Sequence, residues 1–187
     1  MLPREVTLEV VRGVWLALGL VWLAAHFGAK PTEVRQPRRS LVAYTLLLLV
    51  SFALLSGELP WGDVRLLRRR PELTGLGLVI AGAGLAVWSR LVLARNWSGA
   101  VELKVDHELV ERGPYRFVRH PIYTGLLLMF LGTALVRGTA QAFGACTLFL
   151  AVHLWKLRAE EALLAQRFPG VFAAYKARTK ALVPFVF

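Results

Sequence analysis

IYTGLLLMFLGTALVRGTAQAFGACTLFLAVHLW, residues 122–155, is an apolar run too long for a single membrane-spanning helix. At 1.5 Å of rise per residue, about 20 residues cross the roughly 30 Å hydrocarbon core of a bilayer. Arg137 and Gly138 interrupt the run near its middle. We therefore predict two helices that form a hairpin, joined by a very tight turn at these two residues.

Three further apolar runs precede this hairpin, over residues 13–29, 41–57 and 73–89. The last of them is rich in glycine, at Gly75, Gly77, Gly82 and Gly84. Small residues allow helices to approach closely in lipid, where there is no hydrophobic drive for association. The sequence thus predicts an all-α integral membrane protein with about five transmembrane helices, one of which packs closely against a neighbour.

The composition agrees with a membrane location. Hydrophobic residues make up 56% of the chain and charged residues 19%, whereas a soluble domain is about half apolar and a quarter charged. The mean hydropathy is +0.53. The net charge of +11 lies beside long apolar runs, which favours anionic lipid head groups and not nucleic acid as the partner. The single Cys146 excludes an internal disulfide and a cysteine-based zinc site. His26 and His153 have no partners at metal spacing, so no metal is expected.

The character of the chain changes after Trp155. Residues 158–180 mix charges with apolar residues at helical spacing, which predicts a C-terminal amphipathic helix at the cytoplasmic interface, broken once at Pro169-Gly170. Most basic residues lie in residues 90–119 and 156–180, so the positive-inside rule places both segments in the cytoplasm. We expect a bacterial inner membrane. With five spans, four arginines would face outward against that rule: Arg65, Arg68, Arg69 and Arg70.

Residues 106–125, DHELVERGPYRFVRHPIYTG, are polar, aromatic and basic at once, and they abut a membrane span. Pro121 suits the first turn of a helix, where its missing N–H needs no partner. Arg119 and His120 then lie at a helix N-terminus, which favours an anion. Two tyrosines offer flat faces and hydroxyl groups to an aromatic, polar ligand: Tyr115 and Tyr123.

A second polar cluster, KLRAEE at residues 156–161, lies at the far end of the predicted hairpin. Because a hairpin returns the chain to the same membrane face, we expect both clusters to meet at one site. A plainer interpretation remains open: basic residues extend to head groups and aromatic residues form interfacial belts. Glu160 and Glu161 fit it less well, since carboxylates gain nothing from anionic lipids, and for them the alternative is solvent exposure.

Four motifs follow one another in the second half of the chain: HELVERGPYRFVRHPIYTG at 107–125, KLRAEEALL at 156–164, FPGVFAAYKAR at 168–178 and Val183-Pro184-Phe185. In order and separation they resemble the isoprenylcysteine carboxyl methyltransferase family. That family belongs to a wider group of integral-membrane methyltransferases that includes phospholipid N-methyltransferases. The resemblance covers residues 97–185, whereas residues 2–95 match only as generic transmembrane helix.

The resemblance implies one membrane-embedded methyltransferase domain, with N-terminal spans in residues 1–95 and a cofactor-binding catalytic half in residues 96–187. It also implies an S-adenosylmethionine pocket within the helix bundle. The cofactor contacts carried over by position are His107, Glu108, Leu109, Val110, Tyr115, His120, Pro121, Ile122, Tyr123 and Glu160. For the substrate, Lys156 occupies a position where an arginine is more typical in the family, and Arg158 is the competing candidate.

The activity that the resemblance implies is carboxyl O-methylation of a prenylcysteine-like acid or a similar lipophilic substrate. Methyl transfer from a sulfonium is an in-line displacement, so alignment is the enzyme's main task. An ionised carboxylate or thiolate needs no dedicated base, and no catalytic residue is assigned. Two alternatives stay open: methylation of a small thiol or a phospholipid amine, and a non-enzymatic membrane transport or assembly protein.

Overall fold

The computed structural model describes residues 3–26, 31–35, 37–57, 64–67, 71–98, 100–105 and 108–184. The longer helices are α1 (Arg4–His26), α2 (Arg38–Ser56), α3 (Glu72–Leu93), α4 (Pro121–Arg137), α5 (Ala140–Arg167) and α6 (Val171–Arg178). Two short 3-10 turns and two short strands complete the described elements: η1 (Ala94–Asn96), η2 (Gly113–Arg116), β1 (Thr32–Arg35) and β2 (Glu102–Lys104).

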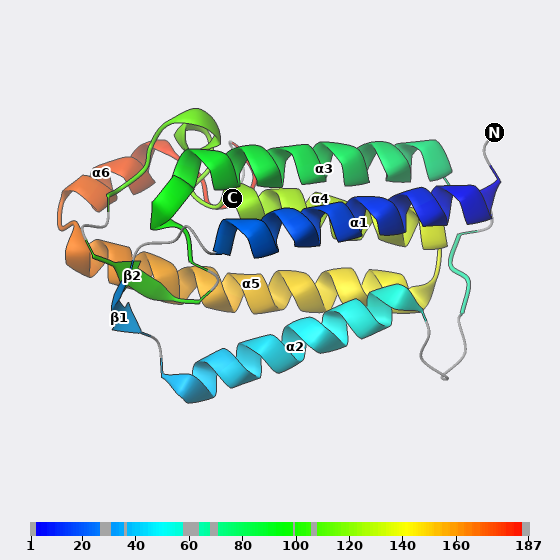
Figure 1. Cartoon of the computed structure of the whole chain (residues 1–187), viewed down its shortest axis with the longest axis horizontal. Coiled ribbons are helices and arrows are strands. Elements are labelled where there is room, and N and C mark those ends of the chain that lie inside the picture. The colour runs from blue at the N-terminus through cyan, green and yellow to red at the C-terminus, as the bar shows by residue number, and fades with distance from the viewer. Residues whose placement is uncertain are drawn as a thin grey trace.

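The helices α1 to α5 run along the longest axis of the molecule (Figure 1). Helix α6 and both strands lie at one end of this bundle, and the turn between α4 and α5 lies at the other. Within the described residues, α1, α2, α3 and α5 are long and apolar enough to cross a membrane, while α4 is shorter, with 17 residues. The predicted all-helical membrane fold is confirmed.

The predicted hairpin turn lies where the sequence places it. Helix α4 ends at Arg137 and α5 begins at Ala140. Gly138 adopts φ 68°, a left-handed conformation that favours glycine, and its N–H donates to the carbonyl of Ala134 at 2.7 Å. Thr139 then caps α5, since its hydroxyl accepts from a backbone N–H of the first turn at 3.4 Å.

Close packing of α3 against α4 depends on glycines from both helices. A Cβ at Gly75 would lie 2.6 Å from the carbonyl oxygen of Gly132, and one at Gly125 would lie 2.6 Å from that of Gly82. The two remaining glycines of α3 have no described atom within 4 Å of such a Cβ. Close approach is therefore confirmed at Gly75 and Gly82 only, because residues seven apart share one helix face.

The C-terminal helical segment differs in one respect from the prediction. No new helix starts directly after Trp155, because α5 continues without interruption to Arg167. The predicted break is found after it, where Gly170 adopts φ 81° before α6 begins. Residues 156–167 contain no helix-breaking residue, so the change in polarity along the chain does not end the helix.

A small antiparallel sheet is an element that the sequence did not predict. Thr32 pairs with Lys104, and Arg35 pairs with Glu102. The sheet joins the α1–α2 connection to the segment before the polar motif, at the same end as α6 (Figure 1). Arg65 pairs with Thr139 at the opposite end, so its conflict with the positive-inside rule persists. Arg68, Arg69 and Arg70 lie outside the described residues.

Candidate functional site

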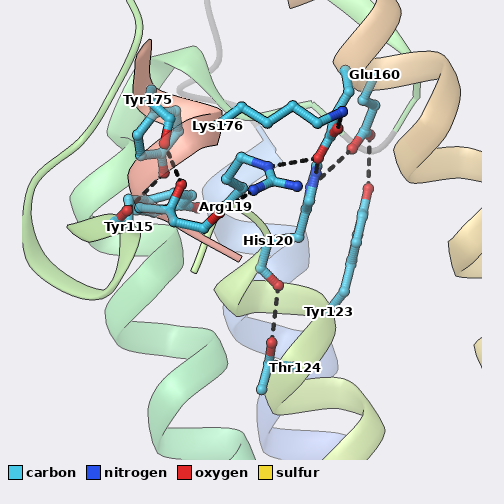
Figure 2. Close-up of polar contacts among 10 residues, drawn as sticks. Tyr115, Arg119, His120, Tyr123, Thr124, Glu160, Tyr175 and Lys176 are labelled. Atoms are coloured by element: carbon cyan, nitrogen blue, oxygen red, sulfur yellow. Dashed lines mark hydrogen bonds and ion pairs between the residues drawn. The ribbon is translucent and has the colours of Figure 1, made fainter. Parts of the chain in front are cut away.

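The α4–α5 hairpin brings the two polar clusters together. The hydroxyl of Tyr123, in the first turn of α4, donates to Glu160 Oε1 at 2.7 Å (Figure 2). His120, which precedes the helix, has Nδ1 3.6 Å from Glu160 Oε2. The rings of His120 and Tyr123 stack, with centroids 5.4 Å apart. Segments that are 37 residues apart in sequence thus form one site at the end of the bundle that carries α6.

The neighbouring carboxylate, Glu161, contacts a different set of residues, which lie before α4 and on α6. Its Oε1 accepts from Arg119 Nε at 2.7 Å and lies 3.3 Å from His120 Nε2, and its Oε2 accepts from Lys176 at 2.8 Å. The side chains of Arg119 and Glu161 are each only 9% exposed. Glu161 is therefore the anion found at the start of α4. Successive residues of a helix point about 100° apart, so Glu160 is directed elsewhere.

The chain after α6 lies against the start of α4. Three hydrogen bonds fix it, from Arg119 N–H to the carbonyl of Lys180 at 2.8 Å, from His120 N–H to Ala181 at 3.0 Å and from the Thr124 hydroxyl to Leu182 at 2.6 Å. The first two bonds satisfy backbone N–H groups at the helix N-terminus that lack a partner within the helix. The C-terminal segment is thereby part of the site's frame.

Helix α6 is held to the polar motif through two buried tyrosines. The hydroxyl of Tyr175 donates to the backbone carbonyl of Tyr115 at 2.6 Å (Figure 2). Burial raises the pKa of both phenols above the ordinary value of tyrosine. Both hydroxyl groups therefore remain protonated, and that of Tyr175 remains a donor.

A cavity of about 350 Å³ lies between these walls. Its polar part is lined by Asn96, Ser98, Glu102, His120, Tyr123 and Glu160. Its apolar part, deeper in the bundle, is lined by Trp22, Leu48, Phe52, Leu126 and Phe149. The volume lies within the range of small-molecule sites, and an apolar wall with a few convergent polar groups is typical of them.

Lys156 lies between the polar and the apolar part of the cavity. The residue is 5% exposed, and its ammonium lies 3.7 Å from Glu160 Oε1. The same nitrogen lies 4.5 Å from the ring centroid of Tyr44 and 5.4 Å from that of Tyr123. A carboxylate and two aromatic faces together stabilise a cation in this buried position.

Two hydrogen-bonded residues of the cavity wall that were not predicted as site residues are Tyr44 and His153. His153 Nδ1 lies 2.9 Å from the carbonyl of Phe149, which can only accept, so Nδ1 carries a proton. In the neutral ring His153 Nε2 then accepts from the Tyr44 hydroxyl at 3.2 Å. His153 is therefore a helix residue with both ring nitrogens hydrogen-bonded. Its place in the cavity wall depends on contacts with α2, which no local pattern reveals.

The predicted cofactor residues are distributed over two adjoining pockets. A smaller pocket of about 60 Å³ is lined by Glu108, Leu109 and Val110, and it shares Tyr115 and His120 with the larger cavity. Of the remaining predicted residues, Ile122, Tyr123, Glu160 and Lys156 line the larger cavity. Pro121 is buried in the first turn of α4 and lines neither pocket, and Arg158 is exposed and lines neither. His107 lies outside the described residues.

Asn96, which is not among the predicted site residues, is an unsatisfied acceptor in the cavity wall. The residue is 9% exposed, and its Oδ1 has no hydrogen-bond partner in the part of the chain that the structure describes. Beside it, the Ser98 hydroxyl donates to Glu102 Oε1 at 2.6 Å. Buried polar atoms are nearly always paired, so this one fits a ligand that brings a hydrogen-bond donor. A ligand with amino and hydroxyl groups meets that requirement.

Comparisons with known proteins identify the family. The family model described as phospholipid methyltransferase matches residues 71–170. A protein-S-isoprenylcysteine O-methyltransferase of Schizosaccharomyces pombe is 29% identical over 122 residues, which are 62% of this chain and 50% of that protein. The cobalt-zinc-cadmium resistance protein CzcN of Cupriavidus metallidurans is 36% identical over 115 residues, 61% of this chain and 50% of that protein.

Among solved structures, a eukaryotic intramembrane Ras methyltransferase, isoprenylcysteine carboxyl methyltransferase, shares the fold. It has a TM-score of 0.55 at 23% identity, and the match covers 77% of this chain and 53% of that one. The chain spans about half the length of the curated relatives it matches. Its motifs resemble the isoprenylcysteine carboxyl methyltransferases, and proteins of this kind are confirmed among its relatives. The chain belongs to the phospholipid methyltransferase family.

Proposed function

We propose that this protein is a membrane methyltransferase that uses S-adenosylmethionine to methylate the carboxyl group of a prenylcysteine-like, lipophilic acid. One observation carries the proposal: Tyr123, Glu160 and Lys156 converge on a cavity that is polar at one end and apolar within the bundle. The site lies at the end of the bundle opposite the α4–α5 turn, and we propose that this end faces the cytoplasm of a bacterial inner membrane.

The residues at the polar end suit this cofactor. Glu160 is 20% exposed on its side chain, so one of its oxygens remains able to accept from an amino or hydroxyl group. The unsatisfied Oδ1 of Asn96 provides a second acceptor. Leu109 and Val110 in the smaller pocket provide apolar contact for a flat ring beside Tyr115. When bound, S-adenosylmethionine supplies an electrophilic methyl group.

Lys156 is the proposed substrate-orienting residue. Its ammonium is buried at the boundary of the two parts of the cavity, where it would bind a carboxylate whose hydrocarbon tail extends into the apolar part. Arg158 is exposed on the other side of α5, which favours Lys156 over it. An ionised carboxylate needs no proton removed, so Lys156 acts by alignment, and the apolar wall acts by excluding water.

Titration calorimetry of the purified protein with S-adenosylmethionine tests the cofactor site. Glu160→Gln, which keeps the shape of the side chain, should weaken binding by about tenfold or more, because a hydrogen bond to a charged group is lost. Glu5→Gln and Arg158→Ala are matched controls and should bind as the wild type does. Equal affinities for all four proteins would contradict the assignment.

A second assay identifies the methyl acceptor. Protein in lipid vesicles is supplied with methyl-labelled S-adenosylmethionine and, separately, with a lipophilic acid, a thiol and a phosphatidylethanolamine. The proposal expects transfer to the acid, and loss of that transfer with Lys156→Met. Transfer to the amine or thiol but not to the acid would reverse the order of the alternatives. Cofactor binding without transfer to any acceptor would favour a non-enzymatic membrane protein.

A further inference from the structure

The apolar part of the cavity ends on a floor of aromatic rings. Phe52 of α2 and Phe149 of α5 line the cavity at this level. Beneath them, Phe130 of α4 stacks on Phe149 with ring centroids 3.9 Å apart and meets Phe52 edge-on at 5.1 Å. Trp15 of α1 packs edge-on against both Phe52, at 5.2 Å, and Phe130, at 5.5 Å. One ring from each of four helices thus contributes to the floor.

The buried part of the floor, Phe130 and Phe149, is rigidly supported. Phe149 is 1% exposed and Phe130 is 0% exposed, so the space below the cavity is filled with side chains. The indole N–H of Trp15 donates to the hydroxyl of Thr133 at 3.1 Å, which fixes the ring. The ring of His153 stacks on the opposite face of the same cluster, 3.9 Å from Phe149. Phe130 and Phe149, held on several sides in this way, do not swing aside to admit a longer ligand. Phe52 is 41% exposed, so it forms the outer edge of the floor and is held by its edge-on contacts with Phe130 and Trp15.

Two helices give the same depth for the cavity. On α5, Phe149 lies seven residues from Lys156, which corresponds to about 10 Å along the axis. On α4, Phe130 lies seven residues from Tyr123, again about 10 Å. An extended chain advances about 1.2 Å per bond, since three bonds span about 3.5 Å per residue. About eight carbons therefore fit between the level of Lys156 and the floor.

We infer that the aromatic floor sets an upper limit on the hydrocarbon tail of the substrate, and that Phe52 and Phe149 are specificity-determining residues. The site would take short S-alkyl or S-prenyl cysteine acids and discriminate against a farnesyl chain. The inference rests on the proposed function only for the acidic head group, because the limit itself arises from the cavity.

The test measures binding separately from methyl transfer. The protein in lipid nanodiscs is titrated with N-acetyl cysteines that carry S-ethyl, S-hexyl, S-octyl, S-dodecyl or S-farnesyl groups. Affinities are compared between the wild type, Phe52→Ala, which opens the floor, and Phe143→Ala. Phe143 lies on α5 in the apolar cluster that contains Phe130 and Phe149, and it does not line the cavity, so it controls for general loss of packing. The ratio of variant to wild-type affinity cancels the partition of each ligand into lipid.

For ligands up to S-octyl, we expect Phe52→Ala to bind with the same affinity as the wild type. For S-dodecyl and S-farnesyl ligands, we expect Phe52→Ala to bind at least about tenfold more tightly than the wild type, a factor typical of methylene discrimination in apolar pockets. Phe143→Ala should give a ratio near one throughout. Leu126→Phe, which narrows the cavity from α4, should lower S-octyl affinity and spare S-ethyl. The inference would be overturned if Phe52→Ala bound ligands of every length as the wild type does and Leu126→Phe left the affinity for the S-octyl ligand unchanged. The hydrocarbon tail would then leave the helix bundle sideways and not reach the floor.

The two proposals fail separately in this design. A length limit in binding, without methyl transfer to any of these acids, would retain the aromatic floor and remove the proposed function. Methyl transfer to the farnesyl acid as efficient as transfer to the S-octyl acid would retain the function and remove the floor as the determinant.

Discussion

Replacing Glu161 by alanine removes the carboxylate that three elements share. Arg119 precedes α4, Lys176 lies on α6 and Glu161 itself lies on α5. The substitution therefore removes the ion pairs that join these three elements, and it leaves the residues that line the cavity unchanged. Arg119 and Lys176, which Figure 2 shows near His120, both pair with this carboxylate. The loss in the free energy of unfolding depends on how well water can solvate Arg119 and Lys176 once the carboxylate is gone.

The buried partner dominates the expected loss. The Arg119 side chain is 9% exposed, and without Glu161 its Nε loses the acceptor 2.7 Å away, although its Nη1 still donates to the carbonyl of Thr179. Removing one partner of a buried ion pair costs about 3–5 kcal/mol. Lys176 is 56% exposed and is readily solvated, so it adds little. We expect the free energy of unfolding to fall by about 3 kcal/mol or more.

Unfolding in mixed micelles of increasing denaturing detergent, followed by near-ultraviolet circular dichroism, measures this loss. Glu9→Ala is the matched control, because Glu9 makes an exposed pair with Arg12 at 2.6 Å and should cost less than about 1 kcal/mol. A double-mutant cycle with Arg119→Ala should yield a coupling energy between about 0.5 and 3 kcal/mol. If Glu161→Ala is no more destabilising than Glu9→Ala, or the coupling energy is zero, the buried network is not a stabilising element.

Three further predictions concern other parts of the molecule. Gly82→Leu should lower the free energy of unfolding by more than about 1–3 kcal/mol, the usual cost of overpacking, because a Cβ at this position meets a backbone carbonyl of α4. Gly77→Leu is the control and should be tolerated, since nothing described lies within 4 Å of a Cβ there. Unfolding in mixed micelles compares the two variants. Tyr175→Phe should cost about 1–3 kcal/mol and speed proteolysis after α6, because a buried carbonyl loses its donor. Lys156→Met should raise KM for a lipophilic acid at least about tenfold in vesicle assays, while Arg158→Met leaves it unchanged, since a buried charged contact is lost only in the first.

The positions of the membrane helices and of the α4–α5 turn could largely be predicted from the sequence. Runs of apolar residues determine where helices can lie in a bilayer, and Arg137-Gly138 marks the one place where the longest run must turn. The continuation of α5 to Arg167 was missed, because a change from apolar to charged residues alters a helix's surroundings and not its hydrogen bonds. The pairing of β1 with β2 was missed because short strands at a membrane surface carry no periodic signal.

The candidate site was predictable only where motifs and topology coincide. The approach of Tyr123 to Glu160 follows from the hairpin alone, since both residues lie near its open end. The separate directions of Glu160 and Glu161 require knowledge of the rotation of α5, which the sequence does not contain. Tyr44 reaches the cavity from α2 and Asn96 from η1, which follows α3, and their positions depend on packing between helices distant in the chain.

Photo-crosslinking of radiolabelled S-adenosylmethionine, followed by peptide mapping, is the most direct test that the hairpin closes a cavity for a methyl donor. We expect label in peptides from residues 108–123 and from residues 153–164, and protection of both by excess S-adenosylhomocysteine. Label confined to residues 4–56, or label that excess S-adenosylhomocysteine does not reduce, would contradict this expectation.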